Sequence, residues 1–210
     1  MMSYKTLTYQ VKDNIARLEI CNPPQNTMSL EFFEELLDVC EKQIKKENFS
    51  GLIITSAGRH FSSGADVNEL TMLIKNNKNN LVPAEMKKNL QAIHILHKLQ
   101  KPKVAILKGI CYGSGFELAL TANYRIAQKN TLIALPEVTF GLMPGLGGIS
   151  ALTYIVGESK ALELILSGRS IDSSEALSLG LIDKICNKES IEEEAVKTIN
   201  ANYKKTMEHR

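Results

Sequence analysis

Two continuous apolar runs constrain the fold of this 210-residue chain more than any other feature. Residues 51–56 and 104–107 lack the polar alternation of a strand with one wet face, so each is predicted to be a β-strand buried on both faces. Apolar residues recur at helical spacing in several other segments, for example over 86–99. Because strand and helix patterns alternate along the chain, we expect an α/β architecture with a parallel sheet.

The remaining segments extend this pattern. Further expected strands are 6–10, 15–21, 124–127, 131–134 and 182–185, and further expected helices are 30–46, 116–121, 149–156, 160–167, 173–179 and 189–210. The first two strands are predicted to form a hairpin through Lys12-Asp13-Asn14, and Ser29 is predicted to cap the helix that follows it. Residues 67–80 are rich in Lys and Asn, and we expect them to be the most flexible segment.

Charge and composition argue against several classes of partner. The chain has 25 Lys and Arg against 23 Asp and Glu, and a net charge of +2 gives no reason to expect nucleic acid or a membrane surface. No apolar run approaches the ~20 residues that span a bilayer, and the N-terminal residues lack the apolar stretch of a secretory signal. The four cysteines form no CxxC pair, so we expect reduced thiols in a cytoplasmic protein; they are Cys21, Cys40, Cys111 and Cys186.

Two glutamates occur in apolar surroundings, where a carboxylate is costly to bury. Glu117 follows the small-residue bend 113–115, and Glu137 precedes the glycine-rich run 144–148. A third bend of this kind lies at 61–66. Each bend places small residues before a helix, where backbone N–H groups lack partners and a ligand can approach closely. Either glutamate alone is explained by capping or by an ion pair, but together with facing bends they favour chemistry on an oxygen that gains negative charge.

Other chemistries have weaker support in the sequence. Neither GxGxxG nor GxxxxGK[ST] is present, so the nucleotide fingerprints are lacking. No GxSxG motif surrounds a serine. His94 and His97 lie three positions apart on an expected helix, but no third ligand is evident, so we expect no metal site.

Five motifs, in their order and spacing over about residues 5–190, resemble those of the crotonase family, the enoyl-CoA hydratase/isomerase superfamily. The motifs are NPPQNTM at 22–28, FSSGADV at 61–67, GICYGSGFEL at 109–118, the segment 135–148 that begins with LPE, and ALSLGLID at 176–183. Each motif alone is weak evidence, whereas their combination is highly specific.

The resemblance implies an α/β fold in which ββα turns repeat as a spiral, which periodicity alone does not predict. It implies a crotonase-like core domain at 1–190 and a C-terminal helical segment at 191–210. Family members usually continue through several more helices, so a shortened C-terminal helical region is expected. By analogy with the family, we expect a homotrimer or a hexamer.

The resemblance also implies an acyl-CoA thioester as substrate, with coenzyme A as part of that substrate and no bound prosthetic group. By position, the backbone amides of Ala65 and Ser114 would form an oxyanion hole for the thioester oxygen. Glu117 would hold and deprotonate a water aimed at the β-carbon, and Glu137 would handle the proton at the α-carbon. The implied substrate-binding residues are Gln25, Ser63, Gly64, Ala65, Asp66, Val67, Tyr112, Ser114, Pro136, Glu137 and Gly145.

Several activities stay open within this resemblance. The presence of both glutamates favours an enoyl-CoA hydratase, a lyase of the kind used in fatty acid metabolism. An enoyl-CoA isomerase, an acyl-CoA decarboxylase and a non-catalytic acyl-CoA-binding subunit are the alternatives. Asn68 stands where a hydratase often has a lysine near the cofactor phosphates, so binding of coenzyme A would rely on Lys101, Lys103 or the main chain instead.

Overall fold

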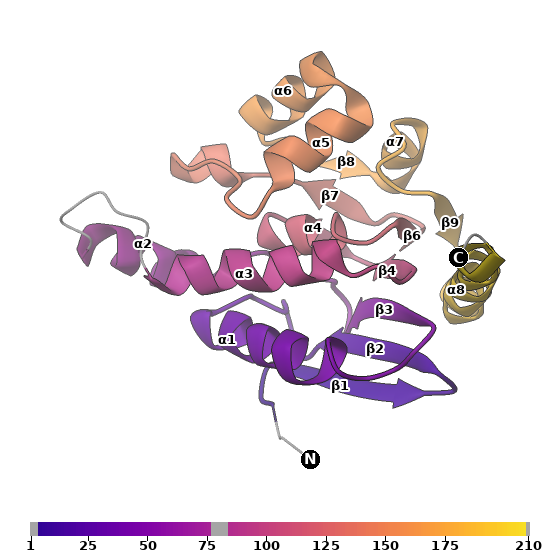
Figure 1. Ribbon diagram of the computed structural model, residues 1–210. Helices are drawn as coiled ribbons and strands as arrows, with labels where there is room; N and C mark the ends of the chain where they lie inside the picture. The colour runs from indigo at the N-terminus through magenta and orange to yellow at the C-terminus, as the bar shows by residue number, and fades with distance from the viewer. Residues whose placement is uncertain (1–3, 77–83, 209–210) are drawn as a thin grey trace.

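A computed structural model describes the chain over residues 4–76 and 84–208 (Figure 1). Its strands are β1 (Leu7–Lys12), β2 (Ile15–Ile20), β3 (Gly51–Ser56), β4 (Lys103–Leu107), β5 (Ile110–Tyr112), β6 (Tyr124–Gln128), β7 (Leu132–Ala134), β8 (Ile171–Asp172) and β9 (Lys184–Cys186). Its helices are α1 (Leu30–Val39), η1 (Cys40–Ile44), α2 (Val67–Asn76), α3 (Ala84–Lys98), α4 (Ser114–Ala119), η2 (Glu137–Phe140), α5 (Gly148–Val156), α6 (Glu158–Ser167), α7 (Ser173–Ser178) and α8 (Ile191–Glu208).

A six-stranded sheet in the order β1-β2-β3-β4-β6-β9 forms the larger layer. Only the first pair, β1 with β2, is antiparallel, and every later pair is parallel. Asp13 and Asn14 join the antiparallel pair with φ angles of 50° and 60°, a left-handed turn that suits the twist of a hairpin. The predicted hairpin and the predicted parallel sheet are both confirmed.

The smaller layer explains the spiral. It contains β5, β7 and β8, and two isolated parallel bridges, Met28 with Ala65 and Ser62 with Cys111, continue the same parallel pairing toward the start of the chain. Successive turns therefore add one strand to the larger sheet, one short strand or bridge to the smaller layer, and then a helix. β4, β5 and α4 form one such turn, and β6 and β7 begin the next. Figure 1 shows these turns rising in sequence order from β1 to α6, so the ββα repeat that the family resemblance implied is confirmed.

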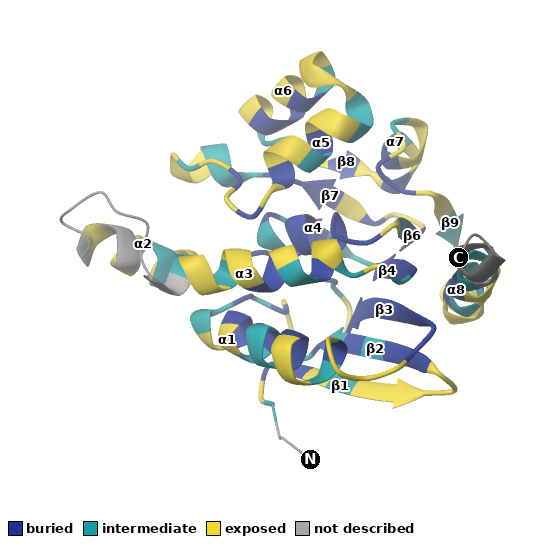
Figure 2. Ribbon diagram, viewed as in Figure 1, coloured by how far each residue is buried: buried dark blue, intermediate teal, exposed yellow. Residues whose placement is uncertain are grey.

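The central strands are buried on both faces, as their apolar runs predict (Figure 2). Ala105 and Leu107 of β4 belong to the main core beneath α1 and α3. Val104 and Ile106 alternate with them and pack into a second cluster on the opposite face. A strand with an apolar cluster on each face has a continuous apolar sequence, because its side chains on both faces are shielded from water.

Helix α8 covers that second face. Ile191, Ala195 and Ile199 recur every four residues and form one buried stripe on an otherwise charged helix. A β-carbon on Gly51 at the start of β3 would lie 2.5 Å from Cγ2 of Ile199, so the absence of a side chain there lets the helix approach the sheet. The segment expected at 191–210 thus contributes part of the core.

Several expected boundaries differ from the structure. The helix predicted over 30–46 ends as an α-helix at Val39 and continues as the π-helical turn η1, while Ser29 caps its start by accepting from the Phe32 amide at 3.2 Å, as predicted. The last strand is β9 rather than 182–185, because Leu181 and Ile182 pack into the core ahead of it. Part of the expected flexible segment is helix α2, and residues 77–80 lie outside the described ranges.

Candidate active site

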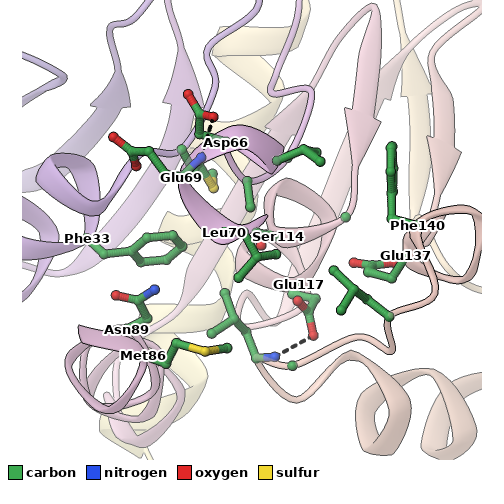
Figure 3. Close-up of a pocket in the computed structure, with 18 of the residues that line it drawn as sticks. Phe33, Asp66, Glu69, Leu70, Met86, Asn89, Ser114, Glu117, Glu137 and Phe140 are labelled. Carbon is green, nitrogen blue, oxygen red and sulfur yellow. Dashed lines mark hydrogen bonds between the residues drawn. The ribbon is translucent and has the colours of Figure 1, made fainter. Parts of the chain in front are cut away.

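A cavity of about 160 Å³ opens where the first turn of α1, the segment 63–70, helix α3, the start of α4 and the segment after β7 meet. Figure 3 shows Phe33, Met86 and Asn89 on one side, Glu137 and Phe140 on the other, and Ser114 and Glu117 between them. Most of the lining is apolar, and few polar groups face it. Such a pocket with a small number of convergent polar groups is the usual form of a small-molecule site.

The first wall of the cavity contains a free backbone donor at Ala65. The parallel bridge to Met28 uses the neighbours of Ala65: the Met28 amide donates to the Gly64 carbonyl at 2.9 Å, and the Asp66 amide donates to the Met28 carbonyl at 3.1 Å. The Ala65 N–H is therefore directed away from this pairing, and it makes no hydrogen bond within the described ranges. Because Ala65 lines the cavity, its amide is available to a ligand.

The second donor is the amide of Ser114, the first residue of α4. The first N–H groups of a helix have no partner within the helix, and the Ser114 amide bonds to nothing else in the described part of the chain. Gly113 precedes it with φ 52° and ψ −128°, a conformation that a residue with a side chain rarely adopts. The glycine therefore allows the sharp entry into α4, whose first residue, Ser114, lines the cavity.

The two donors are brought together by contact between the glycines that precede them. Gly64 has a φ of 97°, and a β-carbon there would lie 3.0 Å from the Tyr112 carbonyl oxygen and 3.6 Å from Cα of Gly113. Side chains at these positions would separate the two segments. The sequence-predicted pair Ala65 and Ser114 thus lies on adjacent segments that line one cavity.

Glu117 is held at the base of the cavity with only 3% of its surface exposed. Its Oε1 accepts from the amides of Leu146 at 2.7 Å and Gly148 at 2.9 Å. A β-carbon on Gly148 would lie 2.9 Å from this oxygen, so the close approach depends on glycine. Burial raises the pKa of the Glu117 carboxyl, and the amides of the 145–148 loop act in the opposite direction. Both bonds go to Oε1, so Oε2 is left for a water or a substrate atom.

Glu137 faces the same cavity from the start of the 3₁₀ turn η2, but its surroundings differ. Its Oε2 is a buried side-chain oxygen without a hydrogen-bond partner, the only such atom in the described ranges. Burial, and to a smaller degree the negative charge of Glu117, raises the pKa of Glu137 to about 7. The Glu137 carboxyl can therefore carry or release a proton near neutral pH.

Nine of the eleven residues expected to bind substrate line the cavity, and two do not. The nine are Ser63, Gly64, Ala65, Asp66, Val67, Ser114, Pro136, Glu137 and Gly145. Gln25 is exposed outside the lining, and its carbonyl accepts from the Ser63 amide at 2.9 Å. The Tyr112 hydroxyl lies 2.9 Å from the Ser170 hydroxyl, also outside the lining.

Sequence reasoning missed much of the cavity wall. Phe33, Met86 and Asn89 come from helices α1 and α3, whose apolar spacing indicated only core packing. Glu69 also lines the cavity, and its Oε2 accepts from the Leu30 amide at 2.8 Å, which ties α2 to the start of α1. A contact between helices that are distant in sequence leaves no local pattern from which to find it.

The two lysines expected near a coenzyme A phosphate lie elsewhere. Lys103 begins β4, whereas the cavity adjoins the segments that follow the carboxyl ends of β3 and β4. Lys103 is 2% exposed and its Nζ donates to the Leu99 carbonyl at 2.8 Å. The Nζ of Lys101 lies 3.6 Å from the centre of the Phe49 ring. Neither lysine lines the cavity, and the expectation for Lys103 is wrong because its ammonium is buried and bonded.

Comparison with known proteins agrees with the geometry. A family model described as "Enoyl-CoA hydratase/isomerase" matches residues 10–209. The "Probable enoyl-CoA hydratase" of Bacillus subtilis (strain 168) is 39% identical over 179 residues, covering 84% of this chain and 67% of that protein. A crystal structure of enoyl-CoA hydratase from Bacillus anthracis superposes with a TM-score of 0.84 at 27% identity, covering 94% of this chain and 76% of that one.

Longer relatives contain a similar region. The "Peroxisomal bifunctional enzyme" of Homo sapiens is 35% identical over 182 residues, and the match covers 85% of this chain but only 24% of that protein. A "Glyoxysomal fatty acid beta-oxidation multifunctional protein MFP-a" from Cucumis sativus is 33% identical over 183 residues, 85% of this chain and 25% of that protein.

Among helices in the described ranges, none combines the length and hydropathy of a membrane span.

Proposed function

The chain belongs to the enoyl-CoA hydratase/isomerase family, and we propose that it adds water across the conjugated double bond of a 2-enoyl-CoA thioester. One observation carries the proposal. Two carboxyl groups with different surroundings, Glu117 and Glu137, face one mainly apolar cavity that also contains the free amides of Ala65 and Ser114. Hydration needs a base, an acid and a site for the charge that develops on the thioester oxygen.

In the proposed reaction the thioester oxygen accepts hydrogen bonds from the Ala65 and Ser114 amides. Oε2 of Glu117 removes a proton from water while the water oxygen bonds to the β-carbon. The electron pair of the double bond moves toward the thioester, and negative charge collects on its oxygen. Fixed amide donors stabilise that charge without reorganising, and deleting one such donor typically costs ~10²–10³ in rate.

The enolate then takes a proton at the α-carbon from Glu137. This carboxyl has a pKa of about 7, so a substantial fraction is protonated at neutral pH. The step leaves Glu117 protonated and Glu137 ionised, and proton exchange with solvent restores the starting state. Oε1 of Glu117 stays bonded to Leu146 and Gly148 in this scheme, which keeps Oε2 aimed at the water.

The test is turnover of crotonyl-CoA, followed by loss of the conjugated chromophore and by identification of 3-hydroxybutyryl-CoA. We expect hydration by the unchanged chain and the same rate for Glu158→Gln, which makes the same chemical change on an exposed residue of α6. Conversion of a 3-enoyl-CoA to a 2-enoyl-CoA, or decarboxylation of a malonyl-type thioester, without hydration of crotonyl-CoA would replace the proposal by an isomerase or a decarboxylase. Tight binding of acyl-CoA without any turnover would indicate a binding subunit.

A further inference from the structure

The hydroxyl of Ser62 is fully buried and makes two hydrogen bonds. It donates to the Asn26 carbonyl at 2.7 Å and accepts from the Gly64 amide at 3.0 Å. Gly64 immediately precedes the donor residue Ala65. Asn26 is itself fixed, since its side-chain amide donates to the carbonyls of Ala57 and His60 at 2.8 and 2.7 Å. The Ser62 hydroxyl therefore connects the segment that presents the Ala65 amide to a rigid neighbouring loop.

The same side chain touches the segment that contains the other donor. A β-carbon on Gly115, the second residue of α4, would lie 2.7 Å from Cβ and 3.0 Å from Oγ of Ser62. Gly115 follows the donor residue Ser114. The absence of a side chain at position 115 thus allows the start of α4 to rest directly on Ser62.

The backbone of Ser62 joins these segments as well. Its amide donates to the Ile110 carbonyl at 3.1 Å, and its carbonyl accepts from the Tyr112 amide at 3.0 Å. This pairing is the parallel bridge between Ser62 and Cys111, and it lies just ahead of both donors in sequence. Ser62 thereby contacts the residues next to both donors, Gly64 and Gly115, although it does not line the cavity.

We propose that Ser62 is a positioning residue that sets the spacing of the two oxyanion-hole amides, because its hydroxyl fixes the segment before Ala65 and its side chain supports the start of α4. The inference rests on the proposed function, in which these amides bind the thioester oxygen. Hydrogen bonds that strengthen as charge develops depend on fixed geometry, and a displacement of 1 Å can lower a rate by ~10²-fold. Loss of this support should weaken binding of the transition state more than binding of the substrate.

The experiment compares Ser62→Ala with the unchanged chain. The variant keeps Cβ against Gly115 and removes only the hydroxyl. We expect kcat for crotonyl-CoA to fall by about tenfold with KM changed less than about twofold. A second readout uses acetoacetyl-CoA, a β-keto thioester whose enolate absorbs in the near ultraviolet. Polarisation by the two amides favours this enolate, so we expect a weaker enolate band for bound acetoacetyl-CoA in Ser62→Ala.

The matched control is Ser50→Ala. Ser50 is 4% exposed, and its hydroxyl donates to the Asn14 carbonyl at 2.8 Å, away from the cavity, just before β3. Both variants lose a buried serine hydroxyl, so a general effect of lost stability would appear in both. We expect Ser50→Ala to keep the kcat and the enolate band of the unchanged chain.

Gly115→Ala tests the same contact by adding a side chain instead of removing a hydroxyl. It replaces Ser62→Ala as the test variant if Ser62→Ala fails to fold. Its β-carbon would press on Ser62, so we expect a lower kcat with a small change in KM. Ser62→Ala or Gly115→Ala with the kcat and enolate band of the control would overturn the positioning role. Failure of the unchanged chain to hydrate crotonyl-CoA would instead overturn the proposed function, and the enolate band would still report on Ser62.

Discussion

Glu117 and Glu137 face the same cavity, yet the segments that hold them differ. The loop 145–148 supplies two amides that bond Oε1 of Glu117 at 2.7 and 2.9 Å. The 3₁₀ turn η2 supplies Glu137 with no partner for Oε2. The first carboxyl is fixed in direction, whereas the second keeps one buried oxygen without a partner, and burial raises its pKa to about 7.

In the proposed hydration, this difference suits each carboxyl to a separate task. A base that aims a water molecule needs a fixed orientation, which hydrogen bonds to one oxygen supply while the other oxygen stays free. A group that donates a proton near neutral pH needs a raised pKa, which burial without a partner supplies. Variants at and beside the two carboxyls should either remove this difference or show how large its effect is.

The largest effect is expected from removing the carboxylates themselves. Glu117→Gln and Glu137→Gln should each lower the rate of crotonyl-CoA hydration by at least ~10²-fold, because each removes a proton-transfer group while keeping the shape of the side chain. Initial rates measure the effect. Rates that match those of Glu158→Gln would show that the carboxyls take no part in the reaction.

A smaller loss is expected from Gly148→Ala, which disturbs only the fixed carboxyl. The new β-carbon would meet Cγ and Oε1 of Glu117 at 2.9 Å. Gly148 is the first residue of α5 and has no positive φ, so alanine introduces no backbone strain there. We expect kcat to fall by roughly tenfold, because the Glu117 carboxyl must shift to make room for the new carbon. An unchanged kcat would mean that the orientation of Glu117 does not matter.

Gly113→Ala is the matched change beside Glu137, and it should lower stability as well as kcat, because a side chain there also separates the segments that carry Ala65 and Ser114. Its β-carbon would lie 3.1 Å from Oε1 of Glu137, and the φ of 52° disfavours a side chain. We expect unfolding free energy to fall by about 1–3 kcal/mol, the usual cost of such a backbone conformation. Chemical denaturation of both glycine variants makes the comparison. A Gly113→Ala variant as stable as the unchanged chain would contradict the strained φ at this position.

The pH dependence of stability should distinguish Glu137 from an ordinary carboxyl. Its pKa rises from 4.5 to about 7 on folding, so the folded state binds the proton more tightly than the unfolded state does. The stability contributed by this group is therefore lost as pH rises from about 4.5 to 7. Glu137→Gln should stabilise the protein above pH 7 and have little effect below pH 4.5. Thermal unfolding of the variant and of the unchanged chain at several pH values measures this effect. A difference in stability that does not change with pH would contradict the prediction.

The smallest effect is expected at Phe140, which follows Glu137 in η2 but forms the outer edge of the cavity and is 55% exposed (Figure 3). Phe140→Ala should raise KM by roughly threefold and leave kcat nearly unchanged, because a half-exposed ring adds apolar contact without touching the reacting atoms. Steady-state kinetics measures this. If Phe140→Ala lowered kcat as much as Gly148→Ala, the prediction would be wrong, and Phe140 would take part in the catalytic step.

The sequence predicted the parts of the fold that have a local cause. All six residues of β3 follow from one apolar run, and Ser29 and the hairpin residues Asp13 and Asn14 from turn and cap chemistry. Strands β5 and β8 were missed because they contain three and two residues, too few to show a period. Their identity depends on pairing with β7, which only the folded chain reveals.

The candidate site was predictable to a similar extent. The apolar context marked Glu117 and Glu137, the glycine bends marked segments with free donors, and the family resemblance assigned the donors to Ala65 and Ser114. The structure brings all four positions to one cavity. The support of these groups was not predictable. The bonds from the 145–148 loop to Glu117 and the contact of Gly64 with Gly113 join residues 29 or more positions apart, and no local pattern encodes them.

The central claim is that the two carboxyls and the two amides act on one thioester. A crystal structure of the protein with bound acetoacetyl-CoA tests it most directly. We predict the thioester oxygen within about 2.7–3.1 Å of both the Ala65 and the Ser114 nitrogen, with the acyl carbons between the carboxyls of Glu117 and Glu137. A thioester oxygen bound away from these amides, or carboxyls that contact different parts of the ligand far from its α- and β-carbons, would contradict the account.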